Sequence, residues 1–169
     1  RRWSSSSGTT DHNLADTLFP YALTDRKPWQ DPLFHLALLA GPAAWFILYL
    51  VLQPAPQWDW PLAAPLAFLM PALVYPVLEE IVFRGLIQEL VQEYISSRSL
   101  GPVSVANLLT TLLFTAMHFI YHAPLWASLV FLPSLVFGFF KDRTGRLIAP
   151  IVLHIFYNAG FLLLFTTPG

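Results

Sequence analysis

Two adjacent carboxylates, Glu79 and Glu80, and a basic residue, Arg84, stand at the inner end of a strongly apolar run. On a helix, with about 100° per residue, Glu80 and Arg84 lie one above the other as a favourable acid-before-base pair. Glu79 points to a different face and is therefore left for another role. A carboxyl group in a low-dielectric site binds a proton more readily than in water, so it can take one from water and give it to a leaving amine. We therefore expect Glu79 to activate water; the alternative is that both glutamates are solvated charges at the end of a span.

Two later apolar stretches each carry polar side chains one helical turn apart. His118 follows Phe114 by four residues, and a neutral imidazole there could share a water molecule with Glu79; the alternative is a hydrogen-bonded core histidine. His154 and Asn158 share one helix face and could hold the oxyanion of a tetrahedral intermediate, whereas the alternative is hydrogen bonding between helices. Taken singly the alternatives are stronger, but three helices that deliver polar groups together favour a catalytic site.

A zinc site is the alternative to a metal-free site. His118 and His122 have the spacing of a zinc-binding pair on one helix face, but Phe119 stands where the familiar zinc-protease motif has a glutamate. The side chains that could in principle bind zinc are Glu79, His118, His122 and His154. Because a glutamate–histidine pair needs no metal, we expect no metal and no cofactor, with zinc held by His118, His122 and His154 as the alternative.

The composition is that of an integral membrane protein. Of the 169 residues, 56% are hydrophobic and 11% are charged, whereas a soluble domain carries about a quarter charged residues. The chain has no cysteine, which excludes disulfides, thiol nucleophiles and cysteine metal sites. Its formal net charge of -1 gives no basic excess for nucleic acid, so the expected partner is the lipid bilayer.

The apolar segments predict an all-α fold, a polytopic membrane helix bundle with about five transmembrane helices. The expected spans are residues 33–52, 61–94, 103–121, 125–140 and 147–165, with a charged loop at 141–146. All nine Lys and Arg residues fall in residues 1–32, 79–102 and 141–146, so the positive-inside rule predicts an N-in, C-out topology.

A polar stripe is expected along the third span. Asn107, Thr111 and His118 fall within about 40° of one another on a helix, so this stripe should face the interior of the bundle rather than lipid. If the third span began at residue 103, His118 would lie too far from the cytoplasmic side to meet Glu79 and His154. We therefore expect this span to begin nearer Asn107, with a loop or interfacial turn before it.

Taken together, three motifs resemble the CAAX-processing and bacteriocin-processing (CPBP, or ABI) family of intramembrane proteases, over roughly residues 61–165. The motifs are Glu79-Glu80-x-x-x-Arg84, Phe114-x-x-x-His118 and His154-x-x-x-Asn158, in this order and on three successive inner helices. Each motif alone is weak, but the three in a five-span bundle without cysteine are quite specific.

The resemblance implies a role for each matched position. Glu79 is similar to the family's water-activating glutamate, and His118 to the histidine that assists it. His154 and Asn158 are similar to the pair that stabilises the oxyanion. The implied supporting residues are Glu80, Arg84 and Phe114.

The resemblance also implies a substrate and a cell compartment. The short chain and the segments 107–110 and 140–143 are similar to bacterial members paired with JDVT-type C-terminal sorting tags. We therefore expect a glutamic-type intramembrane endopeptidase of the bacterial inner membrane that cleaves a membrane-anchored protein near a sorting or CAAX-like tag. The expected organisation is a polar cytoplasmic leader at 1–32 and a membrane protease domain at 33–169, with its catalytic core at about 61–165.

Two other classes of protein stay open. A non-catalytic membrane scaffold or immunity protein could use the same polar residues to bind and sequester a peptide. A small transporter with a proton-relay glutamate would show an inverted repeat, and none is visible in the sequence.

Overall fold

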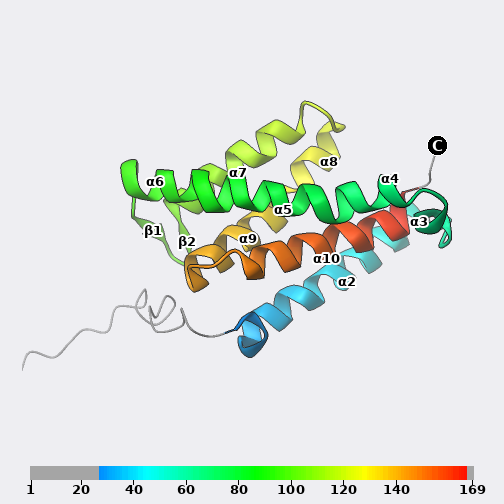
Figure 1. The fold of residues 1–169 in the computed structure, drawn as a ribbon, viewed down its shortest axis with the longest axis horizontal. Coiled ribbons are helices and arrows are strands. Elements are labelled where there is room, and N and C mark those ends of the chain that lie inside the picture. Colours follow the sequence, from blue (N-terminus) through cyan, green and yellow to red (C-terminus); the bar gives the residue numbers. More distant parts are fainter. Residues whose placement is uncertain (1–26, 167–169) are drawn as a thin grey trace, which may run out of the picture.

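The computed structural model describes residues 27–166, and within them the chain is a bundle of helices with one short hairpin (Figure 1). The longer helices are α2 (Pro32–Leu52), α7 (Val105–His118), α9 (Phe131–Thr144) and α10 (Ile148–Phe165). A segmented rod consists of α4 (Pro65–Leu69), η3 (Met70–Val74), α5 (Tyr75–Glu80), η4 (Ile81–Ile87) and α6 (Gln88–Tyr94). The short elements are η2 (Pro28–Gln30), α3 (Trp60–Ala63), β1 (Ser99–Leu100), β2 (Val103–Ser104) and α8 (Pro124–Leu129). Most of the predicted leader, residues 1–26, lies outside the described part of the chain.

The predicted all-α membrane bundle is confirmed. Within residues 27–166, four helices are long and apolar enough to cross a membrane: Pro32–Leu52, Pro65–Tyr94, Pro124–Thr144 and Ile148–Phe165. They correspond to the first, second, fourth and fifth expected spans. The 14 residues of α7 are fewer than the ~20 that a span needs, so the expected third span of 103–121 is too long at both ends.

The start of α7 is set by the hairpin that precedes it. Residues of β1 and β2 pair antiparallel around Gly101, whose φ of 63° suits glycine in a tight turn. The side chain of Ser104 then accepts a hydrogen bond from the backbone N–H of Asn107 and caps the helix. Helix α7, which corresponds to the expected third span, thus begins two residues before Asn107, close to the expected start.

The expected charged loop at 141–146 is wrong over most of its length. Helix α9 continues through Thr144, because Lys141 and Arg143 in its last turn complement the negative end of the helix dipole. Gly145, with φ of 65°, ends the helix, and α10 begins at Ile148.

The rod that carries the two glutamates is not a regular α-helix. Its segments η3 and η4 are π-helical, and they flank α5 on both sides. Pro71 and Pro76, each near the start of a segment, have no backbone N–H and cannot continue the α-helical hydrogen-bond ladder. Short π-helical turns inside helices are frequent at functional sites.

Helices α9 and α10 connect the rest of the bundle. Helices α7 and α10 both pack against α9, and α10 lies between α2 and the segmented rod (Figure 1). The apolar core gathers at the crossing of α2, α9 and α10: Phe34, Ala37, Phe137, Phe140, Ala149 and Leu153. Large apolar side chains also cover much of the outer surface, as expected where a surface faces lipid.

Candidate active site

A buried ion pair forms the base of the site. Glu80 on α5 and Arg84 on η4 are both 0% exposed, and the Arg84 Nη1 lies 3.3 Å from the Glu80 Oε1. The Arg84 Nη2 donates to the Oγ of Ser134 at 2.6 Å and to its backbone carbonyl at 3.0 Å. The predicted contact between Glu80 and Arg84 is present. Through its hydrogen bonds to Ser134, the arginine also connects the rod to α9.

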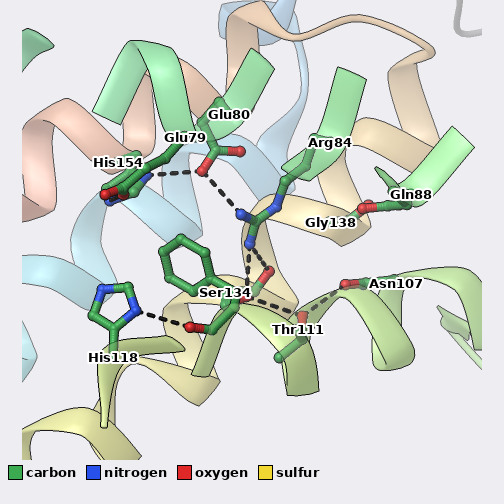
Figure 2. A network of polar contacts seen from close by, with 11 residues as sticks. Glu79, Glu80, Arg84, Gln88, Asn107, Thr111, His118, Ser134, Gly138 and His154 are labelled. Carbon is green, nitrogen blue, oxygen red and sulfur yellow. Dashed lines mark hydrogen bonds and ion pairs between the residues drawn. The ribbon is translucent and has the colours of Figure 1, made fainter. Parts of the chain in front are cut away.

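His154 on α10 lies between the two carboxylates (Figure 2). Its Nδ1 is 2.8 Å from the Glu80 Oε1, and its Nε2 is 3.6 Å from the Glu79 Oε2. Because the same Glu80 oxygen also faces the guanidinium of Arg84, which can only donate, this oxygen is an acceptor and the Nδ1 of His154 is the donor to it. Glu79 differs from its neighbour, since its side chain is 33% exposed.

His118 lies across the site from Glu79 and His154 at the end of α7 (Figure 2). Its Nδ1 is 2.9 Å from the backbone carbonyl of Phe114, so this nitrogen is the donor and the Nε2 keeps a free lone pair. The ring centroid of Phe114 is 4.4 Å from that of His118 and 6.0 Å from that of His154. Phe114 therefore contacts both imidazoles, and the half-buried His118 has one nitrogen available for water or substrate.

Asn158 lies one turn after His154, but its amide has a partner of its own. The Nδ2 donates to the backbone carbonyl of Pro71 in η3 at 3.0 Å. This is the hydrogen bond between helices that the alternative interpretation expected. One N–H of the amide is engaged there, and the second is available to another acceptor.

A chain of buried hydroxyl and amide groups continues from Arg84 into α7 (Figure 2). The Ser134 Oγ donates to the Thr111 Oγ1 at 3.0 Å, and Thr111 donates to the Asn107 Oδ1 at 3.1 Å. All three side chains are 0% exposed. Asn107 and Thr111 thus face the interior, as the polar stripe predicted, whereas His118 is only half-buried.

The structure gathers no zinc-ligand set. Within residues 27–166, no three His, Asp or Glu side chains are grouped so that they could hold a metal ion. His118 and His122 stack with ring centroids 5.5 Å apart, and the ring of Phe114 contacts both His118 and His154. The expectation that no cofactor is needed stays a prediction.

Two residues of the site were not found from the sequence, and both lie on α9. Ser134 binds Arg84, and Phe137 stacks on His154 with ring centroids 4.7 Å apart. Ser134 is one of several hydroxyl residues in the uncharged stretch 99–140, which is a weak signal. Phe137 is one of 14 phenylalanines, and nothing in the sequence distinguishes it.

The fold and the site define the class of this protein, a multi-pass helical membrane protein with a cluster of ionisable groups buried among its helices. The type II CAAX prenyl endopeptidase Rce1-like family matches residues 60–160, which is more than half of the chain, and the chain belongs to this family. The matched region contains every predicted site residue, whereas α2 lies outside it. Neither the curated proteins nor the solved structures contain a match to the chain. The family resemblance drawn from the motifs is confirmed, and the match is not specific to a subgroup.

Proposed function

We propose that this protein is an intramembrane endopeptidase in which Glu79 activates the attacking water. The observation that carries this proposal is the difference between the two adjacent glutamates. Glu80 is fully buried and bound to Arg84 and His154, whereas Glu79 is partly exposed and lies beside the Nε2 of His154. Only Glu79 can therefore meet both a water molecule and a peptide.

The proposed reaction uses groups from three helical segments. A water molecule held between the Glu79 carboxylate and the Nε2 of His118 attacks the peptide carbonyl carbon. Glu79 takes the proton from this water and delivers it to the amine that leaves when the C–N bond breaks. The second N–H of Asn158 and the Nε2–H of His154 stabilise the oxyanion, each donor contributing about 10²–10³ in kcat.

The oxyanion role sets a protonation requirement for His154. Because its Nδ1–H is held by Glu80, the imidazole can donate from Nε2 only when it carries both protons. Glu80 is thus a supporting residue that holds the Nδ1 of His154, and Arg84 orients its carboxylate.

The proposed substrate is a membrane-anchored protein cleaved near a C-terminal sorting or CAAX-like tag, in a bacterial inner membrane. The family's description as CAAX prenyl endopeptidases supports a C-terminal tail. The similarity of segments 107–110 and 140–143 to members paired with JDVT-type tags favours a sorting tag over a prenylated tail.

The test is cleavage of a co-reconstituted tagged membrane protein by the wild type, by Glu79→Gln and by Glu93→Gln, each with and without a strong chelator. We expect Glu79→Gln to lose about 10²–10⁴ in rate, the contribution of a general base. Glu93→Gln is the matched control, because Glu93 is an exposed glutamate farther along the same rod, and it should cleave at the wild-type rate.

Two results would change the proposal. Loss of wild-type cleavage on chelation would move the mechanism to a zinc-dependent one. A wild type that captures the substrate as tightly as Glu79→Gln but cleaves nothing would replace the enzyme with a peptide-binding scaffold or immunity protein.

A further inference from the structure

Helix α9 carries none of the three family motifs, yet one of its side chains covers a face of His154. The ring of Phe137 stacks on the imidazole with centroids 4.7 Å apart and an interplanar angle of 22°. Phe137 is 1% exposed, and the guanidinium carbon of Arg84 lies 5.6 Å from the centroid of the same ring. Phe137 therefore contacts both His154 and Arg84.

We propose that Phe137 is a positioning residue that fixes the plane of the His154 imidazole during peptide hydrolysis. This inference rests on the proposed function, since it concerns the donor that faces the oxyanion. It assigns a role in the site to α9 and to a residue outside the three motifs.

The hydrogen bond to Glu80 does not fix the plane by itself. It holds one atom, the Nδ1 at the edge of the ring, and the χ2 torsion of histidine has a broad minimum. With Cγ attached to the chain and Nδ1 held by Glu80, the ring can still rock about its Cγ–Nδ1 edge, and the Nε2, which lies opposite that edge, then moves most. A face-to-face contact with Phe137 opposes this rocking and keeps the Nε2 directed toward Glu79 and the substrate.

The aromatic face also suits the charge that the reaction requires. His154 donates from Nε2 only as an imidazolium, and the face of a phenyl ring carries the negative part of its quadrupole. Phe114 cannot replace this contact, because it meets His154 edge-on, at 77° and 6.0 Å. Tyr157 is tilted by 41° against Phe137 and packs beside that ring.

The chain offers a matched control for this residue. Phe140 lies one turn after Phe137 on α9 and is 2% exposed, but its ring packs edge-on against Phe34. Phe137→Leu and Phe140→Leu therefore remove the same aromatic ring from equally buried positions of one helix. Only the first removes the contact with His154.

The first measurement is steady-state cleavage by both variants, with their unfolding temperatures. We expect kcat of Phe137→Leu to fall about tenfold below that of Phe140→Leu, with KM unchanged, because the lost contact acts on the charged histidine and not on the substrate. The unfolding temperatures of the two variants should fall by similar amounts. Equal kcat values in the two variants would overturn the positioning role.

A second measurement needs neither cleavage nor a folded variant of Phe137. The ring-proton resonances of His154 in the full-length wild type, assigned by their loss in His154→Gln, should lie upfield of free imidazole because they stand over a phenyl face. Unshifted resonances would overturn the positioning role even in a protein that cleaves its substrate. A wild type that cleaves nothing would instead overturn the proposed function, whatever the resonances show.

Discussion

At the scale of single residues, the site depends on one carboxylate oxygen that serves two partners. The Glu80 Oε1 faces both Arg84 and His154, while the Oε2 of the same group and the Arg84 Nε and Nη1 form no hydrogen bond within residues 27–166. Removing two charged groups from water costs several kcal/mol each, and incomplete hydrogen bonding does not recover that cost. The pair is therefore explained by orientation of His154 rather than by stability.

We predict that removing both charges of the Glu80–Arg84 pair destabilises the protein less than removing the charge of Glu80 alone. Glu80→Gln leaves the guanidinium buried without its counter-charge, so we expect a loss of about 3–5 kcal/mol in the free energy of unfolding. Glu80→Gln combined with Arg84→Met should recover much of this loss, because no buried charge remains unpaired. Denaturant unfolding in detergent micelles measures both.

Cleavage by the same variants separates orientation from stability. Both the single and the double variant should lack activity, since neither holds the Nδ1 of His154 with a carboxylate. A double variant that is no more stable than Glu80→Gln alone, or one that cleaves normally, would contradict this account.

The sequence predicts this site in part, and the limit is physical. The contact of Glu80 with Arg84 could be predicted because both lie within one helical turn. The contact of Glu80 with His154 joins residues 74 positions apart, and it depends on how α10 packs against the rod. The contact of Phe137 with His154 could not be predicted, because it depends on which way the phenylalanine ring points in the packed bundle and not on the residue type.

At the scale of elements, α7 and α9 approach closely at a glycine. A Cβ added to Gly138 would lie 1.9 Å from the Asn107 Oδ1, so no larger residue fits without displacing Asn107. The Asn107 Nδ2 also donates to the carbonyl of Leu135 at 2.9 Å.

The start of α7 was less predictable from the sequence than its existence. The two-residue strands of the hairpin before it are too short to leave an alternating pattern.

Two adjacent threonines on α7 test how much the buried polar chain stabilises this packing. The Thr111 hydroxyl donates to Asn107 and accepts from Ser134, whereas the equally buried Thr110 hydroxyl has no hydrogen-bond partner in the described part of the chain. Valine has nearly the shape of threonine without the hydroxyl. We expect Thr111→Val to lower the free energy of unfolding by about 1–3 kcal/mol, because it leaves buried groups unsatisfied.

Thr110→Val is the control for that substitution, and it should be neutral or stabilising since it removes an unsatisfied hydroxyl. Denaturant unfolding of the two variants under the same conditions gives the comparison. Equal losses in both would show that the polar chain contributes nothing beyond the shape of the side chain.

At the scale of the whole molecule, helix α2 is attached to the region that matches the family, residues 60–160, by contacts at one end and along one face. Asp31 caps α2 and forms an ion pair with Arg143 at the end of α9. The Tyr157 hydroxyl donates to the carbonyl of Ala37 at 2.6 Å, and an added Cβ at Gly160 would meet Trp45. Although α2 lies outside the matched region, it covers α10, the helix that carries His154.

The ends of the bundle also differ in charge, which bears on the predicted N-in, C-out topology. Apart from the buried Arg84, the basic residues within 27–166 lie in segments at the end that holds the hairpin and the starts of α2 and α10 (Figure 1). These residues are Lys27, Arg98, Lys141, Arg143 and Arg146. The segment 53–59, at the opposite end, contains no Lys or Arg. The positive-inside rule assigns the basic end to the cytoplasm.

The topology can be tested cleanly because the chain has no cysteine of its own. Ser97 and Gln57 are both exposed, and they lie in the segments before the hairpin and before α3, at opposite ends of the bundle. We expect Ser97→Cys to react with a membrane-impermeant maleimide only from the cytoplasmic side, in inside-out vesicles. Gln57→Cys should react only from the outside, in right-side-out vesicles. The reverse pattern would invert the topology, and labelling of both from one side would show that the rod between them does not cross the membrane.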